Sequence, residues 1–385
     1  MEKKQDILFL SGIGWNFSWQ RHQQFATLFA RDYRVLFVEM ALSPANLLTE
    51  GRGTFSHWAS WRKGVREIAD DIHLYTCPPV LPFGRSSRVV NRLNQGLVFR
   101  GVRRAMGSMG MNEPIVWVSD PYFSVFSRDF GQKLTIFDWI HGPARTGLSR
   151  KGIVYDSLTE EIVKGADLII TPSRLVYEKY GAGDGRFHFV PNGVDMALYS
   201  VPVPTHPPPE LASLQPPLIG FSGTVGPAVD TGLLEFLAGK RKDWSFVFVG
   251  LVRRDVSALK RYPNVLFLGQ KKPEELPWYL SSLSAGIIPY VVSGDTETVH
   301  PVKTYEYLAA GLPVVSTALP ELEHLGGVIE RAGDKEDFLH RLERVIERDD
   351  EAGKEKRRRL AAEEHSWDGR MRTIEETAAA ALRGR

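Results

Sequence analysis

Short apolar segments alternate with segments of helical spacing along the chain, and this alternation limits the fold more than any other feature. Residues 6–11 form an apolar run ending in glycines, and residues 19–31 carry apolar side chains at helical spacing. Continuous apolar strands separated by helices indicate a parallel sheet that is covered on both faces. Further strands of this kind are expected at residues 34–39, 115–119, 133–137, 168–171 and 187–190.

A proline-rich segment interrupts this alternation. Seven prolines lie between residues 200 and 217, a composition typical of a semi-rigid linker. The alternation then restarts, with strands expected at residues 218–222, 246–250, 265–269, 285–289 and 313–317. We therefore expect an α/β protein with two Rossmann-like units. Because ligands of open parallel sheets lie beyond the carboxyl ends of the strands, the cleft between two such sheets is the expected site.

Residues 300–317, HPVKTYEYLAAGLPVVST, predict a short helix followed by a buried strand. Pro301 suits the first helical turn, and Gly311 suits the left-handed position just after the helix. Lys303 adds a positive charge to the amino-terminal turn, where a phosphate is favoured, and Glu306 follows one turn later. A nucleotide needs this combination of charge and hydrogen-bond acceptor. An ordinary helix with a solvated lysine and glutamate remains the alternative.

The overall composition bounds the class of protein. The chain has 385 residues, a net charge of only +2, and a single cysteine, Cys77. Two domains of ordinary size are expected, without an internal disulfide and without nucleic acid as a partner. The amino-terminal apolar run at residues 7–10 is too short for a signal peptide, and no stretch approaches the roughly 20 apolar residues of a membrane span. These features indicate a cytoplasmic protein, with attachment to the inner face of the cell membrane left open.

Several motifs occur in a fixed order along the chain. They are GADLIITPS at 165–173, FHFVPNGVD at 187–195, PLIGFSGTVG at 217–226, NVLFLGQKKPEELPWYL at 264–280, AGIIPY at 285–290 and PVKTYEYLAAGLPVVST at 301–317. Together they resemble nucleotide-sugar glycosyltransferases of the GT-B fold. The closest resemblance is to bacterial enzymes that build teichuronic acid or exopolysaccharide, some of which begin with a motif similar to WQRHQQ at 19–24.

The resemblance implies how the two domains divide the work. A GT-B protein has two Rossmann-like domains that face each other across a cleft. Residues 1–199 are expected to bind the acceptor and residues 218–365 the nucleotide-diphosphate sugar, with 200–217 as the linker. The last helix, residues 366–385, is expected to cross back to the first domain.

Two residues carry most of the expected donor binding. Glu306 is predicted to accept hydrogen bonds from the ribose hydroxyls, and Lys303 to neutralise the pyrophosphate. Many relatives have a further glutamate eight positions before the one that matches Glu306, and this chain has Thr298 at that position. We therefore assign Thr298 to the donor site in its place.

Other donor contacts are expected where the strands of the second domain end. Gly223 and Thr224 follow the strand at 218–222, and glycine there lets the backbone approach a phosphate closely. Arg253 and Arg254 follow the next strand, where one of them is expected to meet phosphate or base. Gln270 is placed near the base by analogy with relatives. Tight turns and solvated arginines would give the same pattern.

Catalysis is assigned to the first domain. Asp138 and His141 follow the strand at residues 133–137, and a positioned carboxylate is a suitable general base for an acceptor hydroxyl. We predict Asp138 as the base and His141 either as its assistant or as a contact to the sugar, with a capping carboxylate and a packed histidine as the alternatives. Gly14, after the first strand, is expected to line the acceptor side. Glu39 ends the second strand, where an acidic residue binds the ribose in nicotinamide-dependent enzymes, so that class of enzyme remains an alternative.

No aspartate or glutamate occurs between residues 72 and 112, although this stretch holds six arginines. Interleaved apolar residues such as Val89 and Leu93 make it resemble a basic amphipathic helix, which suits an anionic membrane surface. The residues assigned to the acceptor and membrane side are Gly14, Arg85, Arg88 and Arg92. A helix packed on the sheet with solvated arginines remains the alternative.

The sequence thus predicts a metal-independent hexosyltransferase of the GT-B fold. Its donor is a UDP- or GDP-type sugar, and its acceptor a glycan or lipid-linked sugar of cell-surface polysaccharide biosynthesis. No cofactor is expected, and no His, Asp and Cys cluster has the spacing of a metal site. A nucleotide-sugar epimerase on the same frame and a non-catalytic nucleotide-sugar binder are the alternatives.

Overall fold

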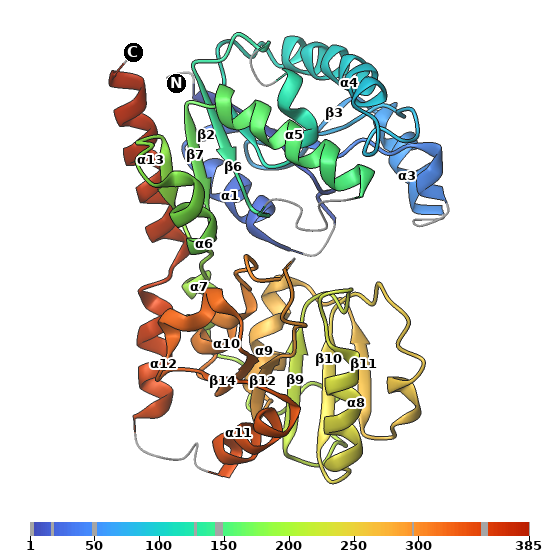
Figure 1. Ribbon diagram of the computed structural model, residues 1–385, viewed down its shortest axis with the longest axis vertical. Helices are drawn as coiled ribbons and strands as arrows, with labels where there is room; N and C mark the ends of the chain where they lie inside the picture. Colours follow the sequence, from blue (N-terminus) through green and yellow to red (C-terminus); the bar gives the residue numbers. More distant parts are fainter. Residues whose placement is uncertain are drawn as a thin grey trace. The chain divides into compact units, whose positions relative to one another are not determined.

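The computed structural model describes residues 4–16, 19–47, 52–126, 129–142, 149–294, 296–347 and 353–384 (Figure 1). The chain divides into two compact units. The first unit comprises Met1–Pro191 with Met371–Arg385, and the second comprises Asn192–Arg370. The first unit thus ends eight residues before the predicted boundary at residue 199, and it includes the end of the chain from Met371.

The first unit contains an eight-stranded sheet in the order β3-β4-β2-β1-β5-β6-β7-β8. The strands are β1 (Gln5–Leu10), β2 (Tyr33–Glu39), β3 (Val65–Ala69), β4 (Ile72–Thr76), β5 (Ile115–Val118), β6 (Leu134–Asp138), β7 (Leu168–Thr171) and β8 (Phe187–Phe189). Neighbouring strands are parallel except β3 and β4, which pair antiparallel. The six strands expected from the sequence are present, and the β3–β4 hairpin was not predicted.

Helices of the first unit connect these strands. They are α1 (Arg21–Phe29), α3 (Arg52–Trp61), α4 (Arg88–Ser108), α5 (Arg150–Gly165) and α6 (Arg174–Val176). The last helix, α13 (Trp367–Arg383), belongs to the first unit from Met371 onward. Burial on both faces of the sheet explains the continuous apolar strands. Phe9 on β1 stacks on Trp117 of β5, with ring centroids 5.6 Å apart, and Phe25 of α1 covers the same indole at 5.2 Å.

The second unit contains a six-stranded, all-parallel sheet in the order β11-β10-β9-β12-β13-β14. The strands are β9 (Leu218–Ser222), β10 (Ser245–Val249), β11 (Val265–Gly269), β12 (Ala285–Ile288), β13 (Val314–Thr317) and β14 (Glu330–Ala332). The helices are α7 (Met196–Ser200), α8 (Thr231–Lys240), α9 (Leu276–Ser281), α10 (Lys303–Ala309), α11 (Lys335–Glu347) and α12 (Lys354–Glu363). The five expected strands are confirmed, and the three-residue β14 was missed.

Both sheets have a point at which the strand order reverses. The chain builds outward from β1 through β2 and then returns to place β5 on the other side of β1. It does the same in the second sheet, where β10 and β12 flank β9. Ligands of open α/β sheets bind beyond the carboxyl ends of the strands at such a switch point. The expected ligand sites therefore lie at the carboxyl ends of β1 and β5 in the first sheet and of β9 and β12 in the second. We refer to these two sites as the β1/β5 edge and the β9/β12 edge.

The proline-rich segment packs on the second unit instead of standing apart as a linker. Leu211 is 2% exposed and belongs to the apolar core that includes Tyr279. The indole Nε1 of Trp278 donates to the carbonyl oxygen of His206 at 2.8 Å, and Lys271 forms a 2.7 Å ion pair with Glu210. These contacts fix the segment along α9 and the end of β11.

Candidate functional site

The β9/β12 edge begins with two glycines that bring backbone segments close together. Gly223, just after β9, has φ of +116°, and Gly250, just after β10, has φ of +141°. A Cβ atom at Gly250 would lie 2.1 Å from the carbonyl oxygen of Gly223, and one at Gly223 would lie 3.1 Å from Nζ of Lys303. Only glycine fits both the backbone conformation and the space. Gly223 and Lys303 are thus brought together, as the sequence predicted for the donor site.

Helix α10 is held against this edge by its apolar face. Tyr307 is fully buried, and its hydroxyl accepts a 2.7 Å hydrogen bond from the backbone N–H of Ser222 at the end of β9. Gly286 on β12 makes room for the ring, since a Cβ there would lie 2.5 Å from it. The helix begins at Lys303, two residues later than expected from Pro301, and Gly311 follows it with the predicted left-handed φ of +79°.

Lys303 is nearly buried yet forms no ion pair with a carboxylate among the residues that the structure describes. Its Nζ donates to the hydroxyl of Tyr290 at 2.7 Å and lies 4.8 Å from the ring centroid of Phe221. Aromatic faces hold an ammonium group by cation–π attraction without neutralising it. The positive charge therefore stays available to an anionic ligand at the end of β9.

Glu306 lies one helical turn after Lys303. Burial raises the pKa of Glu306 to about 7, and the nearby Lys303 ammonium acts in the opposite direction. An ionised carboxylate here offers two acceptor oxygens for paired hydroxyl groups. The lysine and the carboxylate thus form an adjacent pair of opposite charge without a direct ion pair between them.

Two threonines predicted at the donor site have different surroundings. The hydroxyl oxygen Oγ1 of Thr224 is buried and has no hydrogen-bond partner within the described part of the chain. A buried hydroxyl without a partner is costly, so a ligand that supplied one would relieve it. Thr298 is 8% exposed and lies in the loop between β12 and α10.

The arginines and the glutamine predicted for donor binding lie farther along the same edge. The guanidinium NH1 of Arg254 donates to the carbonyl oxygen of Val229 at 2.6 Å, so this side chain braces the loop after β9. Arg253 is exposed, and Gln270 is exposed immediately after β11. The strand order places Gln270 two strands away from Gly223.

At the β1/β5 edge of the first unit, Gly12 lies against Asp120. Leu10 and Val118 are register partners, so these two residues follow the ends of adjacent strands at the same level. A Cβ atom at Gly12 would lie 3.0 Å from both Cβ and Oδ2 of Asp120. Asp120 was not selected from the sequence, although it directly follows a strand that was predicted correctly.

A cluster of polar groups surrounds this carboxylate. Burial raises the pKa of Asp120, while the Arg85 guanidinium and the backbone N–H of Tyr122, which donates to Oδ1 at 2.9 Å, act in the opposite direction. The protein packed around the nearby His141 lowers the pKa of its imidazole by desolvation, and the Asp120 carboxylate opposes that shift. Arg85 also lies 5.1 Å from the ring centroid of Tyr122. Acid, base and cation are thus brought to one edge.

Glu39 and Gly14 lie beside each other at the same edge, where Glu39 fixes the loop after β1. The carboxylate of Glu39 accepts hydrogen bonds from the backbone N–H of Trp15 at 2.8 Å and from the hydroxyl of Thr76 at 2.7 Å. Gly14 lies beside it, since a Cβ there would be 3.4 Å from Oε1. Glu39 therefore braces the loop after β1, an arrangement that does not favour the ribose-binding role left open by the sequence.

The position of Asp138 contradicts the general-base prediction. Asp138 is fully buried, and its two carboxylate oxygens lie 3.0 and 2.9 Å from Nε of Arg21. The side chain of Arg21 is 3% exposed and also lies 4.6 Å from the ring centroid of Phe25. This buried ion pair ties α1 to β6, and a base that contacts an acceptor hydroxyl must be within its reach. We therefore correct the assignment of Asp138 to a structural role.

The basic stretch at residues 72–112 is not a single helix. Ile72–Thr76 forms the buried strand β4, and only Arg88–Ser108 is helical. Arg85 faces Asp120, Arg88 forms a 2.7 Å ion pair with Glu161, and Arg92 is exposed without a carboxylate partner within the described ranges. The three arginines assigned to one surface thus have three different environments.

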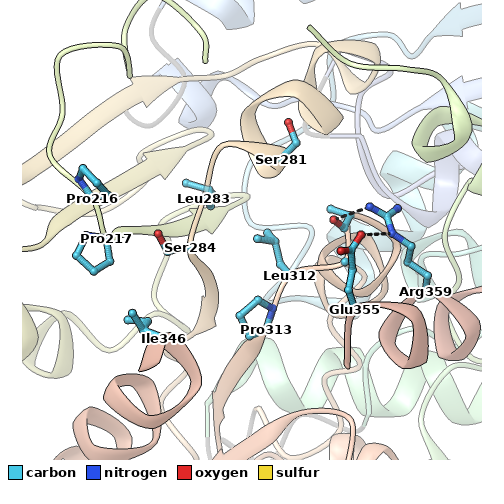
Figure 2. A pocket seen from close by; sticks show the side chains of 12 residues that line it. Pro216, Pro217, Ser281, Leu283, Ser284, Leu312, Pro313, Ile346, Glu355 and Arg359 are labelled. Carbon is cyan, nitrogen blue, oxygen red and sulfur yellow. Dashed lines mark hydrogen bonds and ion pairs between the residues drawn. The ribbon is translucent and has the colours of Figure 1, made fainter. Parts of the chain in front are cut away.

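A separate cavity of about 560 Å³ lies at the opposite edge of the second sheet. Figure 2 shows Pro217, Ser284 and Pro313 around it, and each of these residues immediately precedes a strand. Glu355 and Arg359 form a 2.9 Å ion pair on its wall. Because it lies at the amino ends of the strands, this cavity is distinct from the edge that carries Gly223 and Lys303.

Comparison with known proteins identifies the fold and the family. Residues 216–348 match the family described as Glycosyl transferases group 1. The chain is 32% identical over 279 residues to a Bacillus subtilis (strain 168) protein assigned to teichuronic acid biosynthesis as glycosyltransferase TuaH, covering 67% of this chain and 70% of that one.

Two solved structures share the fold at low sequence identity. One is Anabaena Alr3699/HepE in complex with UDP and glucose, with a TM-score of 0.68, 14% identity, and coverage of 98% of this chain and 100% of that one. The other is WaaG, a glycosyltransferase of lipopolysaccharide biosynthesis, with a TM-score of 0.64, 13% identity, and coverage of 93% and 95%.

The fold is that of a GT-B nucleotide-sugar glycosyltransferase, and the chain belongs to the group 1 glycosyl transferases. The resemblance drawn from the sequence motifs is thereby confirmed, as is the predicted α/β fold class.

Proposed function

We propose that this glycosyltransferase transfers a hexosyl group from a UDP-sugar to a glycan or lipid-linked acceptor in the synthesis of a cell-surface polysaccharide. The observation that carries the donor assignment is the near-buried Lys303, which lies beside Gly223 without a carboxylate partner in the described ranges. The similarity to TuaH supports a polysaccharide acceptor, and the solved complex of HepE with UDP and glucose supports a uridine nucleotide.

In this proposal the donor is held by groups of the second unit. Lys303 pairs with the diphosphate, whose negative charge grows as the glycosidic bond to the sugar breaks. The backbone at Gly223 approaches the phosphates closely, and the unpartnered Thr224 hydroxyl gains a hydrogen bond. Glu306 accepts hydrogen bonds from the ribose hydroxyls. Because Lys303 supplies the positive charge, the reaction needs no metal ion.

The acceptor side is assigned to the β1/β5 edge of the first unit. We assign Asp120 and His141 to the hydroxyl groups that react or lie beside the reacting bond, since Asp138 is buried in an ion pair. Gly12 leaves the space in front of the Asp120 carboxylate that a larger residue would fill. No observation favours the epimerase or the non-catalytic binder, so neither is carried further.

A lipid-linked acceptor would bring the protein to the inner face of the cell membrane. Within the described ranges, no helix has both the length and the apolar character needed to cross a membrane. Attachment at the surface, through the basic face of α4, is the form of association that we propose.

Release of UDP from UDP-glucose tests the proposed reaction, measured with and without a sugar linked to a lipid phosphate. We expect release to depend on the acceptor and to fall by about 10²–10⁴-fold in Asp120→Asn, the range of general acid–base contributions. Glu160→Gln, at an exposed carboxylate of α5, is the matched control and should leave the rate unchanged. Turnover of the donor to an isomer without acceptor would contradict the proposal.

A further inference from the structure

A cavity of about 810 Å³ lies between the end of α3, strand β4 and the second half of α4, in the first unit. Its walls are largely apolar, formed by Trp61, Tyr75, Pro78 and Leu97 among others. Gly101 lets the Tyr75 ring lie against α4, since a Cβ there would be 2.3 Å from the Tyr75 hydroxyl. The volume falls within the range of small-molecule sites.

Three arginines line the same cavity. Arg62, Arg100 and Arg104 are exposed, and none of them has a carboxylate partner in the part of the chain that the structure describes. No aspartate or glutamate occurs from residue 72 to residue 112. Three positive charges around an apolar chamber repel one another, so an anionic occupant would be stabilised by all three.

The neighbouring face of α4 is apolar and exposed. Val89, Leu93 and Leu97 are 72%, 57% and 41% exposed, and their spacing of four residues aligns them in one stripe. Arg92 lies to one side of the stripe, and Arg100 continues it one turn after Leu97. Leu97 and Arg100 belong both to this stripe and to the cavity wall. An apolar stripe bordered by arginines suits the plane of an anionic membrane surface.

We propose that the cavity binds the phosphate and upper acyl chain of an anionic phospholipid, and that the α4 stripe docks the first unit on an anionic bilayer. The arginines at the rim form ion pairs with the phosphate, and the aromatic and aliphatic wall packs against the acyl chain. Inorganic phosphate alone would leave this apolar wall unused. The docking rests on the surface attachment proposed above, whereas the cavity site goes beyond it, because lipid binding there requires neither donor nor acceptor.

Vesicle co-sedimentation tests the docking. The full chain is mixed with vesicles of phosphatidylcholine, with and without phosphatidylglycerol. Each basic residue near an anionic surface contributes a factor of about five in affinity, so Arg100→Gln with Arg104→Gln should weaken binding to the anionic vesicles about thirtyfold. Lys356→Gln with Arg357→Gln, two exposed basic residues of the second unit, is the charge-matched control and should bind like the wild type. Equal binding to both vesicle types, or an equal loss in the control, would overturn the proposal.

A monomeric lipid tests the cavity itself. Dihexanoyl phosphatidylglycerol below its micelle concentration should bind saturably, and Arg104→Gln should weaken it about fivefold. Dihexanoyl phosphatidylcholine and inorganic phosphate should bind far more weakly. If inorganic phosphate binds as tightly as the lipid, the cavity is an anion site only; if the monomeric lipid does not bind, the cavity is not a lipid site. An unchanged unfolding transition of the first unit, followed by the fluorescence of its buried tryptophans, shows that each variant is folded.

Discussion

Removal of either partner of the Arg21–Asp138 ion pair should destabilise the first unit strongly. The two side chains are 3% and 1% exposed, and Nε of Arg21 lies within 3.0 Å of both carboxylate oxygens. When one partner of such a pair is removed, the other charge remains buried without compensation, at a cost of about 3–5 kcal/mol. We expect this loss in Asp138→Asn and in Arg21→Met.

The double variant measures the interaction free energy between the two side chains. Arg21→Met with Asp138→Asn leaves neither charge in the core, so its cost should be smaller than the sum of the two single costs by about 2–3 kcal/mol. Urea unfolding followed by tryptophan fluorescence provides the measurement, since Trp117 and Trp139 lie in the core of the first unit. Because the chain has two units, the transition of the first must be fitted separately from that of the second.

The same variants decide between a structural and a catalytic role for Asp138. If the carboxylate is structural, Asp138→Asn that is folded at low temperature retains a kcat within a few fold of the wild type. A general base would instead lose about 10²–10⁴ in kcat on the same change. Asp138→Asn with wild-type stability but without transfer activity would refute our correction.

Three further predictions follow from the second unit. Gly223→Ala places a Cβ at a φ of +116° and 3.1 Å from Nζ of Lys303, so it should cost about 1–2 kcal/mol and weaken UDP binding, whereas Gly327→Ala, at a φ of +87° in open space, should cost stability without affecting UDP. The raised pKa of Glu306, about 7, means that the folded chain keeps a proton that the unfolded chain loses above its ordinary pKa. The free energy of unfolding should therefore fall by about 1.4 kcal/mol per pH unit between roughly pH 5 and 7, and Glu306→Gln should lack this slope; a slope unchanged in the variant would exclude Glu306 as its source. Addition of EDTA should leave the transfer rate unchanged, and a rate restored only by a divalent cation would contradict the assignment of Lys303 as the charge that stabilises the leaving group.

The strands of both sheets were largely predictable because burial on two faces requires continuous apolar runs. Two of the three missed strands lack this signal, and the third, β4, is mostly buried but includes the polar residues His73 and Thr76. β3, Val65–Ala69, lies at the edge of its sheet with three exposed residues, and it turns into β4 through Asp71, which has a φ of +59°. β14 has only three residues, two of them charged. Edge strands need less apolar surface, so the sequence pattern does not distinguish them from loops.

The structure brings the predicted Gly223 and Lys303 together at one edge but buries the predicted Asp138, and this difference has a physical reason. Gly223 and Lys303 belong to motifs whose place in the family is specific. Asp138 ends a buried strand and Asp120 lies two residues after another, and the sequence offers no means of ranking them. Which of them lies at a switch point depends on strand order, which arises from contacts between distant segments. Arg21, which removes Asp138 from consideration, is 117 residues away from it.

For the basic stretch at residues 72–112, too, the sequence did not predict the tertiary positions of the side chains. The sequence shows its arginines and apolar residues, but not where each of them lies in the folded structure. The structure assigns Arg85 to the neighbourhood of Asp120 and Arg88 to an ion pair with Glu161, while Arg100 and Arg104 line a cavity. Composition therefore predicted a basic surface, and tertiary packing decided which arginines form it.

Calorimetric titration with UDP tests most directly whether the β9/β12 edge of the second unit is the donor site. We compare the wild type with Lys303→Ala and with Lys356→Ala, an exposed lysine of α12. Loss of a charge-assisted hydrogen bond costs about 1.5–3 kcal/mol, so Lys303→Ala should raise the Kd for UDP about 10- to 150-fold, and Lys356→Ala should leave it unchanged. A Kd for UDP that is the same in Lys303→Ala as in the wild type would contradict the account.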